Sequence, residues 1–352
     1  MKILVLGGTG AIGNSIVSSL AESNNLVIVT SRKHRESTSN IKYIKGDAKN
    51  DIFFNTLMKE KYDVIIDFMV YNTKEFARRK ELLLKNTKQY IFFSSCRVYA
   101  DSKKPINENS PRLLDVIDDM EYLATDEYAL SKAREEDILI NSTENNWTII
   151  RPYITYNTNR FQLGVFEKEN WLRRALYGRT IVFPRDIAEK HTTLTHGSDV
   201  AYSMLKLIGN DNVLGETFHI VTNESITWDE VLMYYLDIIK KKTGRSPKVK
   251  YIDNSSAMYD VWNKWQIKYD RLCNRIFDNS KIEGINDSYE YKKAIYGLEE
   301  CLNDFLDKPI WLDINWKFEA LCDKITGEFT PLKEIPEIKM KLKYLIWRFI
   351  KL

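Results

Sequence analysis

Close to its N-terminus the chain has the sequence Lys2-Ile3-Leu4-Val5-Leu6-Gly7-Gly8-Thr9-Gly10-Ala11-Ile12-Gly13. The apolar run over residues 3–6 predicts a buried strand, and residues 12–22 predict a helix directly after the glycines. Glycines allow a tight turn and a close approach of the backbone to phosphate, and a helix N-terminus offers unpaired N–H groups. The stretch therefore predicts a binding site for the pyrophosphate of a dinucleotide.

The first 155 residues continue to alternate between strand and helix patterns. Short segments rich in β-branched or aromatic residues, typical of buried parallel strands, lie at 26–30, 64–68, 89–94 and 148–151. We therefore predict an α/β fold with a Rossmann-type doubly wound parallel sheet and a smaller, discontinuous substrate-binding domain. We assign 1–156 and about 196–222 to the dinucleotide-binding domain, about 157–195 and 223–330 to the substrate domain, and 331–352 to a basic amphipathic C-terminal helix.

The composition argues against several classes of protein. The 352 residues carry a net charge of +3 with the charges interspersed, so nucleic acid is not expected as a partner. The four cysteines are scattered without a C-x-x-C pair, which indicates neither a metal site nor a disulfide framework. The apolar run at the start is too short for a signal peptide, and no stretch approaches the roughly 20 apolar residues of a membrane span. We expect a cytoplasmic protein that holds no metal.

Two side chains with complementary chemistry stand four residues apart in Tyr128-Ala129-Leu130-Ser131-Lys132. In a helix this spacing puts both on one face. A phenol titrates at about pH 10, and a nearby ammonium favours its phenolate form, so such a pair can exchange a proton with a hydroxyl or carbonyl group. Ser94 ends a predicted strand and Ser95 follows it, and a hydroxyl group at this carboxyl end can polarise the same oxygen. We interpret Tyr128, Lys132 and one of these serines as a catalytic set.

Together these motifs resemble the extended short-chain dehydrogenase/reductase family, of the NAD(P)-dependent epimerase/dehydratase type that acts on nucleotide sugars. The resemblance covers about residues 1–230 and rests on residues 7–13, Ser94-Ser95-Cys96-Arg97-Val98-Tyr99, Tyr128 with Lys132, Arg151-Pro152, and His196-Gly197-Ser198-Asp199-Val200-Ala201. It implies catalytic roles for Ser95, Tyr128 and Lys132, a nucleotide-sugar substrate and a homodimer. The dinucleotide contacts that it implies are Gly7, Thr9, Gly10, Ala11, Ile12, Gly13, Ser31, Arg32, Asp47, Ala48, Phe68, Met69, Tyr128, Lys132 and Tyr153.

The residues after Ser95 restrict the reaction. Family members that eliminate water have an Asp-Glu pair there, whereas this chain has Cys96 and Arg97, and a guanidinium cannot act as a base. We expect hydride transfer at a ring carbon of the sugar, C4 first, and slightly favour a 4-ketoreductase over a 4-epimerase with tightly bound NAD. A third alternative is a non-catalytic protein that binds RNA or protein. Residues 171–179, 183–184 and 223–228 resemble a branch of the family that includes RNA-binding proteins of plastids.

The choice of dinucleotide is expected to depend on the end of the second strand. There NAD-binding proteins usually present a carboxylate to the ribose 2′-hydroxyl, and NADP-binding proteins present hydroxyl and arginine side chains to the phosphate. The chain has Ser31-Arg32-Lys33, and the next acidic residue is Glu36. Arginine forms charge-assisted hydrogen bonds with a phosphate. We predict NADP, with NAD as the alternative.

The substrate side gives weaker signals. Arginine suits a diphosphate because its planar fork donates two parallel hydrogen bonds. For Cys96 two interpretations stay open: an acid or base at a ring carbon, or, as we favour, a small residue that packs under the cofactor. The candidate substrate contacts are Cys96, Arg97, Arg160, Arg174 and His191.

The last residues, 339–352, are basic and apolar. As a helix they would place Leu342, Leu345, Ile346, Phe349 and Ile350 on one stripe with lysines at its flanks. We favour a helix that docks this stripe on the core or on a second subunit. The alternative is an interfacial helix on an anionic membrane.

Overall fold

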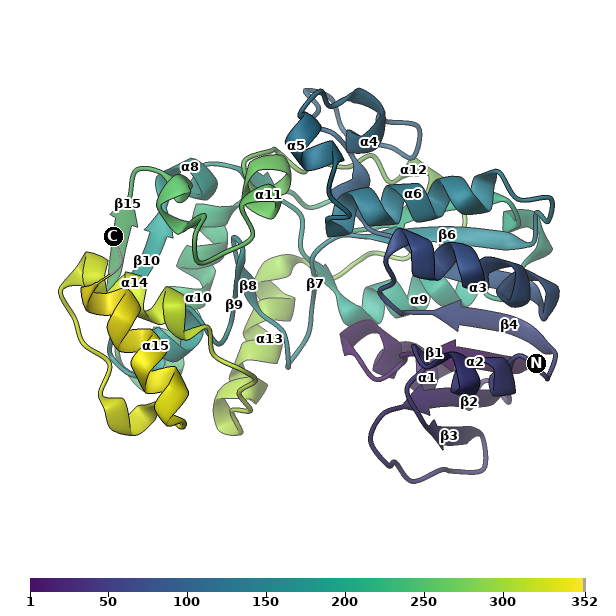
Figure 1. Cartoon of the computed structure of the whole chain (residues 1–352), viewed down its shortest axis with the longest axis horizontal. Helices are drawn as coiled ribbons and strands as arrows, with labels where there is room; N and C mark the ends of the chain where they lie inside the picture. The colour runs from purple at the N-terminus through teal and green to yellow at the C-terminus, as the bar shows by residue number, and fades with distance from the viewer. Residues whose placement is uncertain (351–352) are drawn as a thin grey trace.

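A parallel sheet of seven strands forms the larger of two lobes (Figure 1). The computed structural model describes residues 1–350, with the backbone alone at Ala11. The strands are β1 (Lys2–Leu6), β2 (Leu26–Ser31), β3 (Ile41–Lys45), β4 (Tyr62–Asp67), β5 (Thr87–Phe93), β6 (Trp147–Pro152) and β13 (Glu216–Ile220). They lie in the order β13-β6-β5-β4-β1-β2-β3, and every neighbouring pair is parallel. The predicted Rossmann-type α/β fold is confirmed.

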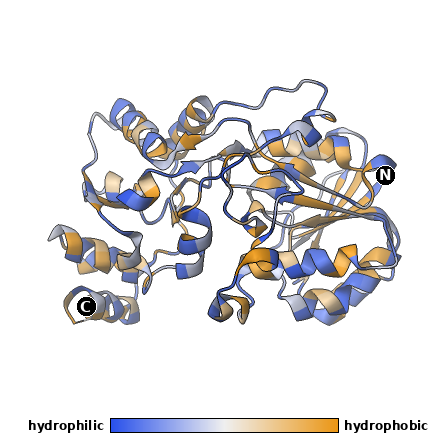
Figure 2. Ribbon diagram, turned by 90° about the horizontal axis from the view of Figure 1, so that it is seen from above, coloured by the Kyte–Doolittle hydropathy of each residue, from blue (hydrophilic) through white to orange (hydrophobic). Residues whose placement is uncertain are grey.

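Helices cover both faces of the sheet. α1 (Ala11–Glu22) and α9 (Gly197–Leu207) cover one face, and α2 (Asp51–Leu57), α3 (Thr73–Lys85) and α6 (Tyr128–Ile140) cover the other. Along β1, Ile3 and Val5 pack on the first face while Leu4 and Leu6 pack on the second, because side chains alternate along a strand. Figure 2 shows the strands of this sheet mostly in the colour of apolar residues. Burial on both faces explains their continuous apolar sequences.

The predicted strands agree with β1, β2, β4, β5 and β6 to within two residues at each end, and the predicted helix over 12–22 is α1. The strand β3 was not predicted. It lies at the edge of the sheet, and Lys42 and Lys45 interrupt its apolar residues. Edge strands carry such charges and lack the apolar run that marks a buried strand.

The second lobe is smaller and packs around an apolar cluster that includes Phe166, Trp171 and Trp228 and continues to Cys96 and Ala133 of the larger lobe (Figure 1). In it β10 (Ile181–Pro184) and β15 (Val249–Ile252) pair in parallel. The helices around this pair are α7 (Leu172–Leu176), α10 (Trp228–Thr243), α13 (Ala294–Asp307), α14 (Trp316–Thr326) and α15 (Ile338–Phe349). We propose that the substrate domain comprises residues about 157–195 and 223–330, as the sequence predicts.

Short elements connect these parts of the chain. They are α4 (Leu113–Val116), α5 (Met120–Leu123), β7 (Thr155–Tyr156), β8 (Gln162–Leu163), β9 (Phe166–Glu167), α8 (Arg185–Ala188), β11 (His191–Thr192), β12 (Thr195–His196), β14 (Ile226–Thr227), α11 (Lys264–Gln266) and α12 (Ser280–Glu283).

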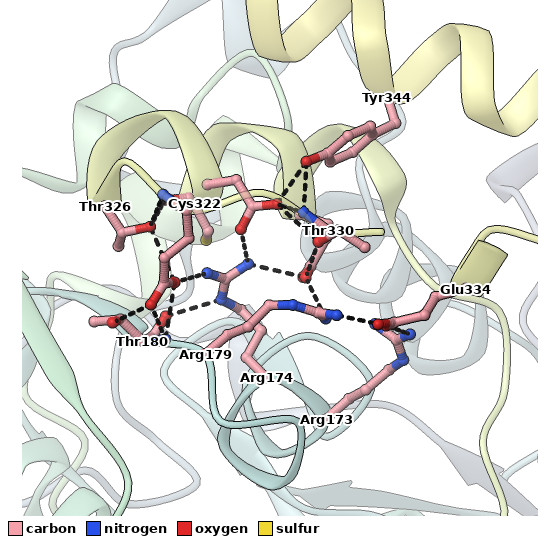
Figure 3. Close-up of polar contacts among 12 residues, drawn as sticks. Arg173, Arg174, Arg179, Thr180, Cys322, Thr326, Thr330, Glu334 and Tyr344 are labelled. Atoms are coloured by element: carbon pink, nitrogen blue, oxygen red, sulfur yellow. Dashed lines mark hydrogen bonds and ion pairs between the residues drawn. The ribbon is translucent and has the colours of Figure 1, made fainter. Parts of the chain in front are cut away.

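Arg174, on α7, is buried in a cluster of acidic side chains inside the smaller lobe (Figure 3). Its guanidinium lies 2.9 Å from carboxylate oxygens of Glu319 and Asp323 and 3.0 Å from Glu328. The prediction that Arg174 contacts the substrate is wrong, because its side chain is only 1% exposed and is enclosed by these carboxylates inside the smaller lobe.

The C-terminal helix exists as α15, and residues 351–352 lie outside the described part of the chain. The stripe does not dock on the core of this chain, so that half of the prediction is wrong, while docking on a second subunit stays a prediction. Leu342, Ile346 and Phe349 are 55%, 42% and 62% exposed, whereas Tyr344 is fully buried and donates a hydrogen bond to Asp323 at 2.6 Å. A polar anchor thus turns the apolar stripe outward. Among residues 1–350 no helix combines the length and apolar character that crossing a membrane requires.

Candidate active site

A cleft of about 390 Å³ opens where β1, β4, β5 and β6 end at their carboxyl edges. Parallel sheets of this kind bind ligands at that edge. The cleft brings together nine of the residues predicted from sequence: Ile12, Phe68, Met69, Ser95, Arg97, Tyr128, Lys132, Tyr153 and Arg160. The other lining residues are Val70, Phe93, Ser94, Pro152, Ile154, Thr155, Gln162, Gln266 and Arg271.

The glycine loop fits the pyrophosphate of a dinucleotide. Gly7 has a φ of +72°, and the N–H of Thr9 donates to its carbonyl in a tight turn. A Cβ on Gly13 would come within 2.7 Å of the loop backbone, whereas one on Gly10 would meet nothing within 4 Å. Gly10 is the N-cap of α1 and provides no side-chain cap, so the first N–H groups of the helix stay available to phosphate. The side chain of Ala11 lies outside the described part of the chain.

Tyr128 and Ser95 reach the cleft from two different elements. Tyr128 is the first residue of α6 and is half-buried. Ser95 follows β5, and its Oγ accepts a hydrogen bond from the N–H of Arg97 at 3.2 Å. The adjacent Ser94 Oγ is buried and has no hydrogen-bond partner among residues 1–350. Buried hydroxyls without a partner are rare, so Ser94 also marks a position for a polar ligand atom.

The ammonium group of Lys132 is buried beside two carboxyl groups. Its Nζ donates to Glu135 Oε2 at 3.0 Å and lies 4.4 Å from the centre of the Phe92 ring. Asp67, the last residue of β4, is fully buried and accepts hydrogen bonds from two tyrosine hydroxyls. The second carboxyl group, Glu135, was not among the residues predicted from sequence, because only the turn of α6 brings it against Lys132.

Burial raises the pKa of both Asp67 and Glu135, while the nearby Lys132 ammonium opposes the shift. A carboxyl group with a raised pKa retains its proton more readily and cancels less of the lysine charge. Both carboxyl groups lie near this one ammonium group, and burial opposes the ionisation of each. The arrangement lets Lys132 present positive charge to the cleft.

The predicted contacts to the adenosine end lie along the edge of the sheet beyond the cleft. Ser31 ends β2, and its Oγ accepts a hydrogen bond from the N–H of Lys33 at 3.3 Å. Arg32 is exposed at the same edge. Asp47 and Ala48 follow β3, the first exposed and the second buried. The end of β2 therefore offers a hydroxyl and a cation, a combination that suits a 2′-phosphate.

Arg97 and Arg160 are the two predicted substrate contacts that line the cleft. The guanidinium of Arg97 lies 5.2 Å from the centre of the Tyr128 ring and forms an ion pair with Glu127 at 2.6 Å. Arg160 is more exposed and pairs with Glu167 at 3.1 Å. Exposed pairs of this kind are weak, so Arg160 can exchange Glu167 for an anionic ligand.

Cys96 and His191 do not line the cleft. Cys96 is fully buried, its thiol donates to the carbonyl of Arg151 at 3.1 Å, and burial raises its pKa well above the ordinary thiol value. The substrate contact predicted for Cys96 is therefore wrong, and its role is packing. His191 lies in β11, where its backbone N–H donates to Asn274 Oδ1 at 3.0 Å and its ring Nδ1 lies 3.4 Å from the hydroxyl of Ser225. Its contact with the substrate stays a prediction.

Sequence analysis missed Gln162, Gln266 and Arg271, which reach the cleft from the smaller lobe. Arg271 is buried and donates from Nε to the carbonyl of Gly164 at 2.8 Å. These residues belong to no motif, and only the packing of the two lobes brings them to the cleft. Within residues 1–350, His, Cys, Asp and Glu side chains form no group of three that could hold a metal ion.

Residues 3–220 match the model of the NAD dependent epimerase/dehydratase family. The chain belongs to this family. The match covers the glycine loop, Ser95, Tyr128 and Lys132 and ends with β13, so it contains the seven-stranded sheet apart from Lys2. The family resemblance stated from the motifs is confirmed.

Among curated proteins the chain is 28% identical to the chloroplast stem-loop binding protein of 41 kDa b of Arabidopsis thaliana, over 65% of this chain and 60% of the relative. It is 30% identical to UDP-glucose 4-epimerase of Lactobacillus helveticus, over 32% of this chain and 41% of the relative. The chain thus spans less than two thirds of the length of either relative. A solved structure of UDP-glucuronic acid 4-epimerase from Bacillus cereus, in complex with UDP-glucuronic acid and NAD, has a TM-score of 0.67 at 15% identity, covering 88% of this chain and 100% of that one. This last likeness concerns the fold.

Glu135→Gln tests the environment of Lys132 through the pH dependence of stability. Because burial raises the pKa of Glu135 above its ordinary value of about 4.3, the folded chain binds more protons than the unfolded chain just above that pH. Stability from this group is present at low pH and is lost as the pH rises through that range. The free energy of unfolding of wild type minus that of Glu135→Gln should therefore fall from about pH 4 to 7, by an amount on the order of 1 kcal/mol.

Chemical denaturation of both proteins across this pH range measures the difference. The exposed Glu22→Gln is the matched control and should show no such trend. A difference that rises with pH would contradict the account, because it would mean that pairing with Lys132 outweighs burial.

Proposed function

We propose that this chain is an NAD(P)-dependent enzyme that transfers a hydride between nicotinamide and a ring carbon of a nucleotide-activated sugar, with C4 as the favoured carbon. The observation that supports this most is the cleft itself, where Ser95, Tyr128 and Lys132 meet next to Ile12 of the helix that follows the glycine loop. Membership of the NAD dependent epimerase/dehydratase family supports the same conclusion.

Each of the three residues has a proposed role. When bound, the dinucleotide supplies the hydride acceptor or donor. Tyr128 takes the proton from the reacting hydroxyl, or returns one to the carbonyl oxygen. Lys132 holds the nicotinamide ribose and places its ammonium group on the same face of α6 as Tyr128. Ser95 donates a hydrogen bond to the reacting oxygen.

Two reactions are candidates, and each goes with a different dinucleotide. We favour a 4-ketoreductase that uses NADP, because Ser31 and Arg32 at the end of β2 suit a 2′-phosphate. A 4-epimerase with tightly bound NAD is the second candidate. It is favoured by the partial similarity to a UDP-glucose 4-epimerase and by the NAD in the solved UDP-glucuronic acid 4-epimerase.

A non-catalytic protein that binds RNA is a weaker candidate. It rests on the name of the chloroplast relative, with which the chain shares 28% identity. A binding protein does not need the Ser95, Tyr128 and Lys132 set, and this chain retains all three in one cleft. We further propose a cytoplasmic homodimer, as predicted from the sequence, with a nucleotide sugar as its small-molecule partner. A membrane contact of α15 is a separate proposal.

Tyr128→Phe should abolish turnover and leave dinucleotide binding nearly unchanged, because the substitution removes only the transferable proton. General acid–base catalysis contributes about 10²- to 10⁴-fold, so kcat should fall by at least about 100-fold. Turnover is measured on a panel of UDP-, dTDP- and GDP-hexoses and their 4-keto forms, and binding by fluorescence titration. Tyr296→Phe, at a tyrosine that is 67% exposed, is the control. If kcat of the Tyr128→Phe protein stays within a few-fold of the wild-type value, the assigned mechanism is wrong.

Arg32→Asp should weaken NADP binding by about 10- to 100-fold, the value of charge-assisted hydrogen bonds to a phosphate. The affinity for NAD should stay within a few-fold, since the 2′-hydroxyl is neutral. Calorimetric titration with both dinucleotides measures the two affinities, and Lys59→Asp, at an exposed lysine away from the sheet's carboxyl edge, is the control for net charge. If wild type binds NAD more tightly than NADP, the NADP assignment fails and the epimerase gains support.

A further inference from the structure

α15 is fixed to the smaller lobe by one face. Tyr344 is fully buried, donates from its hydroxyl to Asp323 at 2.6 Å and accepts from the N–H of Thr330 at 2.9 Å. Arg348 donates to the carbonyl of Glu328 at 3.1–3.2 Å. The orientation of the helix about its own axis is therefore set by hydrogen bonds.

Arginines of the neighbouring segment stabilise this arrangement (Figure 3). Arg174 pairs with Asp323 and Glu328, the same two residues that contact α15. Arg173 and Arg179 pair with Glu334, shortly before α15 begins. Because buried ion pairs are costly to break, α15 cannot easily rotate to hide its other side.

The opposite side of α15 is apolar and exposed. Ile338, Leu342, Ile346 and Phe349 are 75%, 55%, 42% and 62% exposed. Each residue turns a helix by about 100°, so these positions form one stripe on the side opposite Tyr344. Phe329, 47% exposed, extends the stripe because its ring lies 6.3 Å from that of Phe349. Contiguous apolar surface of this kind marks an interaction site.

Positive charge borders this stripe. Residues 338–350 contain no Asp or Glu. By helix geometry Lys341 lies on one flank, and Lys339 and Lys343 lie on the other. No ion pair joins these three lysines to a carboxylate within residues 1–350. In Figure 1 α15 lies at the outer edge of the smaller lobe, away from the sheet, so a large flat partner can approach it.

We propose that α15 docks this protein on an anionic lipid surface, with its exposed stripe among the acyl chains and its lysines at the phosphate groups. An apolar stripe with cations along its edges is the pattern of helices that lie in a membrane interface. A second copy of the chain is a poor partner for the stripe. A two-fold interface would bring the lysines beside the stripe in one copy next to those of the other copy, and like charges repel. Phosphate headgroups balance these charges.

The test uses the full chain and sedimentation with vesicles. Wild type should bind equimolar phosphatidylcholine and phosphatidylglycerol vesicles, should bind phosphatidylcholine alone at least tenfold more weakly, and should lose affinity at high salt. Leu342→Gln with Phe349→Gln should reduce binding to the anionic vesicles at least tenfold. The matched control is Ile52→Gln with Met120→Gln, at positions 81% and 74% exposed elsewhere, and it should bind as wild type does.

A second pair, Lys339→Gln with Lys343→Gln, should also weaken binding to the anionic vesicles while leaving the melting temperature of the protein unchanged. Wild type that fails to bind these vesicles overturns the proposal. So does binding that survives the Leu342→Gln and Phe349→Gln substitutions. A dimer in light scattering that these two substitutions dissociate, without vesicle binding by wild type, would assign the stripe to a second copy instead.

Discussion

The ammonium group of Lys132 is buried at the wall of the cleft, and several elements of the larger lobe surround it. α6 supplies Lys132 and Glu135 on one face, β4 ends at Asp67, and β5 places the Phe92 ring beneath the ammonium. Burial raises the pKa of both carboxyl groups, so they cancel less of the lysine charge than two freely ionised carboxylates would. The position of Tyr128, four residues earlier, follows from the same helix.

The parallel sheet converts this local arrangement into a site. Each strand that ends at the cleft delivers one part: β1 the glycine loop, β4 Phe68 and Met69, β5 Ser95, and β6 Tyr153. The smaller lobe closes the other side with Arg271 and its neighbours. Residues that follow the carboxyl ends of parallel strands lie close together in space, even when they are far apart in the sequence. Motifs from distant parts of the chain therefore line the same cleft.

Sequence analysis succeeded where a local pattern specifies the structure and failed where contacts join distant parts of the chain. The buried strands, the glycine loop and Tyr128 with Lys132 are specified by local patterns, and these predictions placed the residues correctly. Arg174 was misjudged because an arginine that binds a diphosphate and an arginine that binds three carboxylates have the same local sequence. Its partners stand about 150 positions later in the chain. Arg271 was missed because only the packing of the two lobes brings it to the cleft. Glu135 stands three residues after Lys132, and it was missed because the sequence does not show that this pair is buried.

α15 shows a different limit. The amphipathic pattern was recognised, but burial of its apolar stripe was expected, and the structure buries Tyr344 instead. The most apolar face of a helix is the buried one only where no buried hydrogen bond fixes another face against the protein. Here Asp323 and Thr330 provide that anchor from α14 and the loop that follows it.

The central claim is that hydride passes between a sugar ring carbon and the nicotinamide in this cleft. The most direct measurement uses nucleotide hexoses that carry deuterium at C4, incubated with the protein and oxidised dinucleotide. Mass spectrometry of the dinucleotide then reports the transfer. The account predicts deuterium on the nicotinamide ring for at least one hexose of the panel. A protein that binds the dinucleotide and the hexoses but transfers no deuterium from C4 would contradict it.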